Sequence, residues 1–132
     1  MHSIFKKLIP DFFLFQVWLA NYGISLNKFQ QKFLETGEII PRQMGKTFLV
    51  YCLLAYLCNT CDETEIEFSL VYVYISKLQL TVPLDGEASS VVILRNFYSG
   101  FIDFLNKYFS SVFKVCEKQY LTIKIQKLEN RN

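Results

Sequence analysis

Apolar residues recur with helical spacing along much of the chain, and this pattern predicts several helices. Residues 26–34 have apolar positions at 26, 29, 33 and 34, which is the spacing of one helix face. Residues 48–58 are apolar almost all round, as is typical of a buried helix. The segment Phe12–Ala20 has no clean apolar face, and we interpret it as a short helix that packs against the domain. Residues 90–109 predict an amphipathic helix with Ser90 as its N-cap and apolar positions at Leu94, Phe97, Phe101, Leu105 and Tyr108.

Other segments have the pattern of β-strands. Residues 67–76 are rich in β-branched and aromatic side chains, as in a strand buried on both faces. Residues 119–127 alternate between apolar and polar, which indicates a half-buried strand, and residues 38–40 can form a short strand end. A helix at 48–58 is long enough to cross between two parallel strands. The sequence therefore predicts an α/β fold with a parallel sheet covered by helices, in which the strands at 38–40 and 67–76 are parallel.

The tripeptide Gly45-Lys46-Thr47 lies between the short strand and the apolar helix. It matches the second half of the phosphate-loop pattern G-x-x-x-x-G-K-[ST]. Glycine lets the backbone approach a phosphate oxygen, the Lys46 ammonium suits the β- and γ-phosphates, and the Thr47 hydroxyl suits Mg²⁺. The first glycine of the pattern would fall at position 40, where the chain has Ile40. The alternative interpretation is a surface turn with a solvated lysine.

The longer segment Pro41-Arg42-Gln43-Met44-Gly45-Lys46-Thr47 resembles the deviant Walker A loop of large terminase subunits. These are the DNA-packaging ATPases of tailed phages and herpesviruses, and they commonly replace the first glycine. The resemblance continues more faintly from about Leu26 to Asn130. It implies an incomplete P-loop ATPase domain over residues 26–132, after an N-terminal packing helix in residues 1–25. It also implies that ATP and Mg²⁺ are the cofactors.

The resemblance gives individual residues a role. Lys46 and Arg42 stand where the family places its catalytic cations, with Arg42 reaching the γ-phosphate, and Thr47 stands where it binds Mg²⁺. Gln43, Met44 and Gly45 complete the nucleotide-binding loop. An aromatic-Gln pair precedes this loop in the family, and its glutamine contacts adenine, so Phe29-Gln30 makes Gln30 the candidate here. The alternative is that Gln30 is an exposed polar residue on a packing helix. Ser76 and Lys77 occupy the segment that helps to line the DNA path.

A working ATPase of this type also needs a Walker B aspartate and a catalytic glutamate after an apolar strand. No run of four apolar residues in this chain is followed by Asp-Glu. Asp62-Glu63 follows a loop, Asp103 lies within a predicted helix, and the acidic cluster of the terminase nuclease is missing. We therefore expect a partial product that is truncated before Walker B and does not hydrolyse ATP by itself.

Composition sets wider bounds. With 132 residues, 52% of them hydrophobic, the chain is expected to form at most one domain and not to be disordered. A net charge of +2 gives no basic face from which nucleic-acid binding would follow by itself.

The cysteine pattern favours free thiols over a zinc site. The Cys58-x-x-Cys61 pair has no second pair, and His2 is the one histidine of the sequence. The apolar run at 48–58 is shorter than the roughly 20 residues of a membrane span, so no membrane partner is expected.

The function that this resemblance implies is the N-terminal part of a viral terminase that binds ATP to power packaging of double-stranded DNA into capsids. Its partners would be double-stranded DNA, the portal, the small terminase subunit and, at full length, further copies of itself. Its location would be the host nucleus for a herpesvirus-like protein and the host cytoplasm for a phage protein. Two alternatives stay open: a helicase-like P-loop ATPase, and a non-enzymatic interaction protein in which Gly45-Lys46-Thr47 is accidental.

Overall fold

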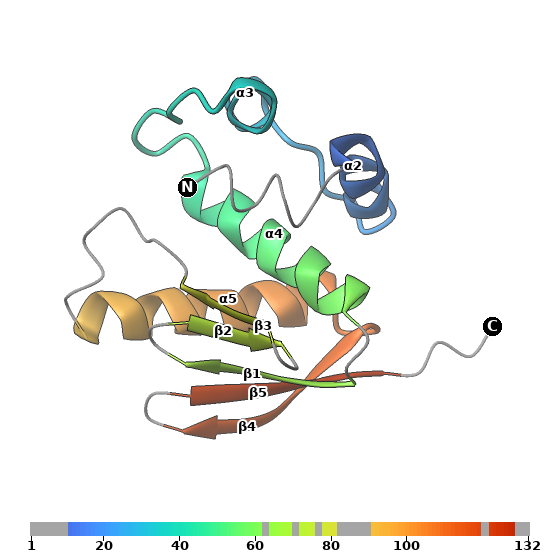
Figure 1. Ribbon diagram of the computed structural model, residues 1–132, viewed down its shortest axis with the longest axis vertical. Coiled ribbons are helices and arrows are strands. Elements are labelled where there is room, and N and C mark those ends of the chain that lie inside the picture. Colours follow the sequence, from blue (N-terminus) through green and yellow to red (C-terminus); the bar gives the residue numbers. More distant parts are fainter. Residues whose placement is uncertain are drawn as a thin grey trace. The chain divides into compact units, whose positions relative to one another are not determined.

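The computed structural model describes residues 11–61, 64–69, 72–75, 78–81, 91–119 and 122–128. The chain falls into two units, Met1–Leu57 and Cys58–Asn132. The first unit contains the helices α2 (Phe12–Ala20) and α3 (Lys28–Thr36), and most of α4 (Lys46–Thr60) (Figure 1). The second contains the end of α4, a sheet and the helix α5 (Val91–Tyr108).

The helix α2 packs through one pair of apolar residues and a group of aromatic rings. Phe15 and Leu19 are fully buried, which confirms the predicted packing helix. The rings of Phe15 and Trp18 meet Tyr56 of α4 edge-on, at centroid distances of 5.1 and 5.3 Å. Such aromatic pairs contribute beyond the area that they bury. These rings join α2 to the part of α4 that lies in the same unit.

The helix α3 has well-defined signals at both ends. It begins at Asn27, where a reciprocal capping box links the side chain and backbone of Asn27 to those of Gln30. It ends at Gly37, which has a left-handed φ of 79° and donates its backbone N–H to the Phe33 carbonyl at 2.8 Å. Phe33 and Leu34 are buried, as the helical spacing of residues 26–34 predicts.

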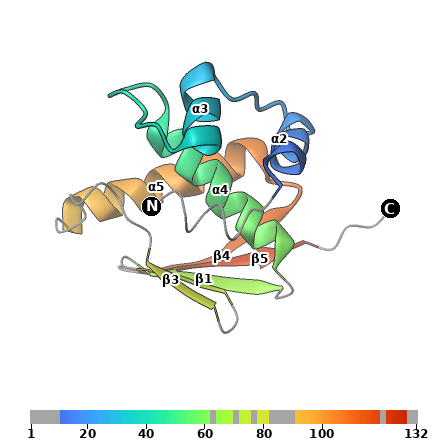
Figure 2. The same cartoon turned by 45° about the horizontal axis from the view of Figure 1, so that its top comes forward.

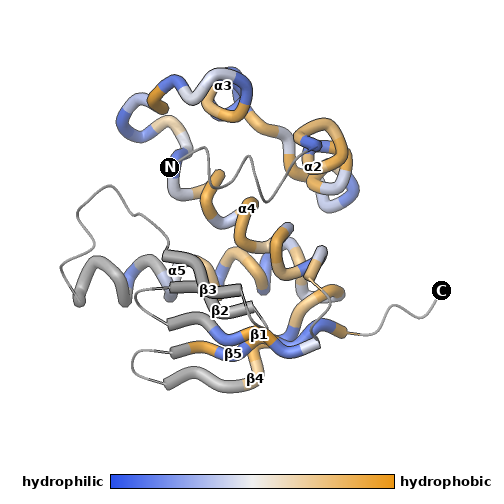
Figure 3. The backbone as a smooth tube through the Cα atoms, viewed as in Figure 1, coloured by the Kyte–Doolittle hydropathy of each residue, from blue (hydrophilic) through white to orange (hydrophobic). Residues whose placement is uncertain are grey.

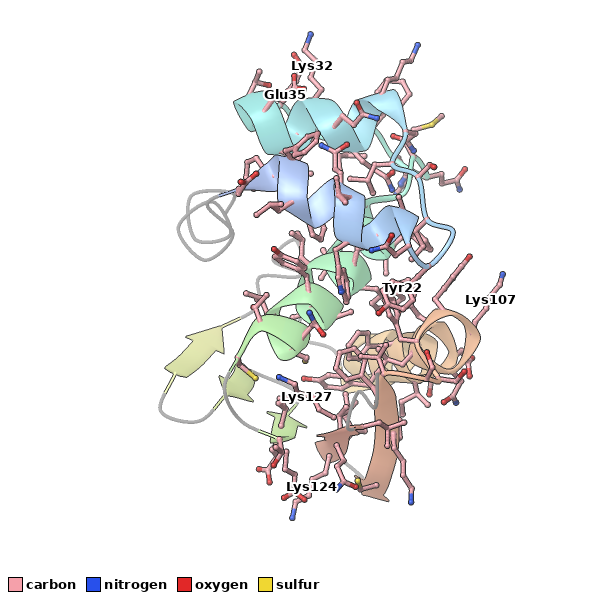
Figure 4. The ribbon with its side chains drawn as sticks, turned by 90° about the vertical axis from the view of Figure 1, so that its right-hand side faces the viewer. Tyr22, Lys32, Glu35, Lys107, Lys124 and Lys127 are labelled. Atoms are coloured by element: carbon pink, nitrogen blue, oxygen red, sulfur yellow. The ribbon has the colours of Figure 1, made fainter. Side chains whose placement is uncertain are left out.

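The helix α4 confirms the apolar helix predicted at 48–58 and extends it at both ends. Its residues are apolar along almost its whole length, as the hydropathy colours show (Figure 3). The buried ones lie on every side of the helix and include Leu49, Val50, Cys52, Leu53, Leu54, Ala55, Leu57 and Cys58. A lysine bonds to carbonyls at the end of the helix: Lys127 Nζ donates to the Asn59 carbonyl in the last turn at 3.1 Å, and to the Cys61 carbonyl just after the helix at 2.6 Å (Figure 4).

The described strands form one five-stranded sheet in the order β3-β2-β1-β5-β4. Every described pairing is antiparallel. This arrangement differs from the parallel sheet that the sequence predicted. The strands are β1 (Glu65–Ser69), β2 (Tyr72–Ile75), β3 (Leu78–Thr81), β4 (Phe113–Gln119) and β5 (Thr122–Lys127).

The difference has identifiable physical reasons. The apolar run at 67–76 does not form one doubly buried strand; it supplies β1 and β2, which pair with Phe68 opposite Val73. An unbroken apolar run is compatible with either arrangement, because it has no alternation to show which side is buried. Residues 38–40 are not in a strand. Only these three residues lie between Gly37, which caps α3, and Pro41. Proline has no backbone N–H to donate to a neighbouring strand, so a strand could not continue through Pro41 with full hydrogen bonding.

The second unit builds its core from α5 and the strands that follow it. The predicted amphipathic helix is confirmed: Phe101 and Leu105 are buried, and the side chains of Leu94 and Phe97, together with Ser90, lie outside the described residues. Figure 2 shows α5 running along one face of the sheet. Phe109 packs against Phe113 at the start of β4, with ring centroids 6.1 Å apart. On β5, Ile123 and Ile125 are buried, as the alternation predicted.

The cysteines are free thiols, in very different surroundings. Burial raises the pKa of Cys52 from 9.0 to about 12. Burial also raises the pKa of Cys58, with a smaller contribution from Cys61. Cys116, by contrast, is exposed. Buried thiols that stay protonated are poor nucleophiles, because the thiolate is the reactive form.

We therefore expect iodoacetamide to modify Cys116 in the folded protein and to leave Cys52 unmodified even at pH 10. Since the folded pKa of Cys52 lies above the unfolded value, this thiol's stabilising contribution is complete below about pH 9 and is lost as the pH rises toward 12. Mass spectrometry of tryptic peptides, with and without urea, measures the extent of modification at each site. Equal rates at Cys52 and Cys116 without urea would contradict the prediction.

Candidate functional site

The residues of the predicted phosphate loop lie between the end of α3 and the start of α4. The loop contains a turn in which the Met44 N–H donates to the Pro41 carbonyl at 3.2 Å. The helix α4 starts at Lys46, and Thr47 follows in its first turn with an exposed side chain. A helix start carries the positive end of the helix dipole. The first turn of α4 holds no acidic residue that would offset it.

Two loop residues have left-handed backbone conformations. Gly45 has a φ of 91°, immediately before the first residue of α4. Gln43 has a φ of 65° and is the one non-glycine residue with positive φ in the part of the chain that the structure describes. Such a conformation costs an ordinary residue about 1–2 kcal/mol and is concentrated at functional sites. Gln43 is the third residue of the turn closed by the Met44 N–H, a position at which β-turns of type II also take a positive φ.

Gly45 is required for a reason that differs from the expected one. A Cβ at this position would lie 2.4 Å from Gln30 Nε2, 3.2 Å from Gln30 Cδ and 3.4 Å from Asn27 Nδ2. The space that a side chain would take is thus filled by the Gln30 amide, and not left open for a phosphate oxygen. The glycine makes room for a neighbouring side chain from α3.

Gln30 has partners that the sequence did not predict. Its side chain is 3% exposed, and it is the one buried polar residue among those that the structure describes. Its Oε1 accepts from the Asn27 N–H at 2.8 Å, and its Nε2 donates to the Gly45 carbonyl at 2.8 Å. Gln30 is therefore a buried residue that is bonded to the loop, and not the exposed polar residue of the alternative interpretation.

Asn27 is a site residue that the sequence analysis missed. Its Nδ2 donates to the Met44 carbonyl at 3.1 Å, and its Oδ1 accepts from the Gln30 N–H at 2.9 Å. A signal was present, because Asn followed three residues later by Gln is the pattern of a capping box. That pattern fixes the start of α3 but does not show that both side chains also reach the loop.

The remaining predicted site residues are solvent-facing or lie outside the described residues. Arg42, Gln43 and Met44 have exposed side chains, and the neighbouring Ile39 is 82% exposed. Asp103 is exposed on α5, in the second unit. Asp62, Glu63, Ser76 and Lys77 lie outside the described residues. Within the described ranges, no three His, Cys, Asp or Glu side chains gather where they could hold a metal ion.

Gly45, Lys46 and Thr47 thus lie together at the start of α4, and the side chains of Asn27 and Gln30 bond to the loop from the start of α3. No protein-family model matches the chain, and no curated protein or solved structure is significantly similar to it. In the described part of the chain, none of the helices combines the length and apolar character needed to cross a membrane.

Proposed function

We propose that the loop 41–47 binds the phosphate groups of ATP together with Mg²⁺, as the nucleotide-binding half of a terminase-type DNA-packaging ATPase. The observation that carries the proposal is the left-handed Gly45 directly before Lys46, the first residue of α4. A Gly-Lys-Thr tripeptide at that place puts an ammonium and a hydroxyl beside the positive end of a helix. These are the groups that phosphate and Mg²⁺ need.

Each residue of the loop has a separate part in the proposal. Lys46 neutralises the charge of the β- and γ-phosphates. The Thr47 hydroxyl is exposed and provides an oxygen for Mg²⁺. Arg42 is exposed in the preceding turn, where its guanidinium is available to the γ-phosphate. Mg²⁺, when bound, would neutralise the negative charge of the phosphates.

The proposal has two levels with different support. Phosphate binding is supported by the loop geometry together with the Gly-Lys-Thr sequence. The assignment to a packaging ATPase is supported by the resemblance of residues 41–47 alone, and the antiparallel sheet adds nothing to it. Double-stranded DNA, the portal and the small terminase subunit are proposed partners at this second level, as is a site of action in the host nucleus or host cytoplasm. ATP hydrolysis by this chain alone is not part of the proposal.

Titration of the purified chain with ATP, with and without Mg²⁺, tests phosphate binding. We expect Thr47→Ala to weaken ATP binding about tenfold when Mg²⁺ is present, since one hydroxyl contact to the metal is lost. The same variant should bind ATP as the parent chain does when EDTA removes Mg²⁺. Thr47→Ser keeps the hydroxyl and is the matched control, with Mg²⁺-dependent binding retained. Isothermal titration calorimetry gives the dissociation constants.

Two outcomes would count against the proposal. If the parent chain binds no ATP at millimolar concentration, the loop is not a phosphate site under these conditions and phosphate binding is refuted. If Thr47→Ala and Thr47→Ser weaken binding equally with and without Mg²⁺, Thr47 affects the fold of α4 and does not serve the metal.

A further inference from the structure

Two side chains from the start of α3 hold the loop by its carbonyl groups. Asn27 Nδ2 bonds to the Met44 carbonyl at 3.1 Å, and Gln30 Nε2 bonds to the Gly45 carbonyl at 2.8 Å. We call this set of four residues the clasp. It joins residues that are 17 and 15 positions apart in sequence, all within the first unit. The clasp is therefore a tertiary feature and not a local turn.

The capping box fixes which way the Gln30 amide faces. Its oxygen must point at the Asn27 N–H, 2.8 Å away, because only the oxygen can accept. The amide nitrogen then has to face the Gly45 carbonyl. Burial of this side chain keeps water from competing for the same bonds. The clasp is thus set before any ligand arrives.

The clasp and the first turn of α4 together set the direction of the loop's N–H groups, because the Gly45 carbonyl also accepts from the Leu49 N–H at 3.0 Å. In a trans peptide the carbonyl and the following N–H point in opposite directions. Because the Met44 and Gly45 carbonyls point toward α3, the N–H groups of Gly45 and Lys46 point away from it. That is the side on which a phosphate group would have to approach, since Gln30 and Asn27 fill the other.

We propose that Asn27 and Gln30 are positioning residues that hold the phosphate loop in its ligand-binding conformation, and that Gln30 does not read the nucleotide base. This inference rests on the proposed function, because it assigns roles around the same loop. It predicts a site that takes the triphosphate group of any nucleoside triphosphate, with no adenine selectivity from Gln30.

The argument against base reading is one of hydrogen-bonding capacity. A glutamine that recognises adenine uses its amide oxygen and an N–H at the same time. In this protein the oxygen is bonded to Asn27 and one N–H to Gly45. Only the second N–H is left, on a side chain that is 3% exposed. To read a base, Gln30 would have to break its bonds to both Asn27 and Gly45.

The first test needs no ligand. Amide hydrogen exchange is measured by NMR on the full chain for Gln30→Met, which keeps the side-chain length but removes both bonds. We expect exchange of the amides of residues 42–46 to rise about tenfold or more. Gln31→Met is the matched control: Gln31 is the next residue of α3, and its Nε2 bonds to the Leu26 carbonyl at 2.8 Å, not to the loop. Unchanged loop exchange in Gln30→Met, or an equal rise in both variants, would overturn the positioning role.

The second test compares Mg²⁺ complexes of ATP, GTP and inorganic triphosphate. We expect ATP and GTP to bind the parent chain within about threefold of each other, and Gln30→Met to weaken all three ligands by the same factor. Loss of ATP affinity alone in Gln30→Met, or a preference for ATP of more than about tenfold that this variant abolishes, would show that Gln30 reads the base. If the parent chain binds none of the three, the proposed function fails, and the exchange experiment still decides whether the clasp holds the loop.

Discussion

Lys46→Ala is expected to weaken Mg·ATP binding by about 2–3 kcal/mol, or roughly 30- to 150-fold in the dissociation constant. The variant removes an ammonium group at the first residue of α4, next to the proposed position of the β- and γ-phosphates. Charge-assisted contacts of this kind are about twice as strong as neutral hydrogen bonds, so the loss should exceed the roughly tenfold loss expected for Thr47→Ala. Calorimetric titration of the purified variant gives the loss directly.

Lys32→Ala is the control for this experiment. It removes the same charge from an exposed position on α3, where Lys32 and Glu35 project away from the rest of the first unit (Figure 4). We expect Lys32→Ala to bind Mg·ATP as the parent chain does. If the two variants lose the same affinity, net charge rather than the loop explains the binding. If Lys46→Ala loses none, phosphate binding by this loop is refuted.

The helices could be predicted from the sequence because each has a signal that depends on its own residues. The apolar run of α4 and the periodicity of α5 place both helices within about two residues of their actual ends. The same holds for α2, whose predicted bounds Phe12–Ala20 match the structure. In each case the apolar residues that become buried recur within one continuous segment, so the helix can be predicted without knowing which distant residues pack against it.

The sheet could not be predicted in the same way, because strand direction depends on the partner. Strand β5 alternates and was recognised, but its pairing with β1, Ile125 opposite Ile66, is not encoded in either segment alone. Strand β4 was missed because its sequence FKVCEKQ alternates between apolar and polar residues only over its first three positions. It also contains an irregularity between Val115 and Glu117, which breaks the period of two.

The candidate site was predicted in part. The sequence placed Gly45, Lys46 and Thr47 at a helix start, where the structure also has them. It gave Gln30 the wrong surroundings and passed over Asn27, because the bonds from these residues to the loop span 15 and 17 positions. A short strand was expected to position the loop. In the structure, residues 38–40 are not in a strand, and the side chains that bond to the loop come from the capped start of α3.

The close approach of the Gln30 amide makes Gly45 sensitive even to a small substitution. We expect Gly45→Ala to lower the free energy of unfolding by about 2–5 kcal/mol. About 1–2 kcal/mol of this comes from placing a Cβ at a left-handed φ of 91°, and the rest from its 2.4 Å approach to Gln30 Nε2. The Gln30 amide can move aside only by breaking its bonds to Asn27 and Gly45.

Gly23→Ala separates the two contributions. Gly23 also has a left-handed φ, 78°, but nothing lies within 4 Å of the position that its Cβ would take. Gly23→Ala should therefore lower the free energy of unfolding only by the cost of the left-handed backbone, about 1–2 kcal/mol.

The stability of both variants can be measured by urea denaturation, followed by the fluorescence of Trp18, the single tryptophan of the chain. This signal reports on the first unit, since Trp18 packs on Tyr22 and Tyr56. In a chain that already carries Gln30→Ala, the atoms that the new Cβ would approach are absent. Gly45→Ala should then lower the free energy of unfolding by about as much as Gly23→Ala does. If Gly45→Ala costs no more than Gly23→Ala in the presence of Gln30, the close approach of the Gln30 amide to the loop is not a feature of the folded protein.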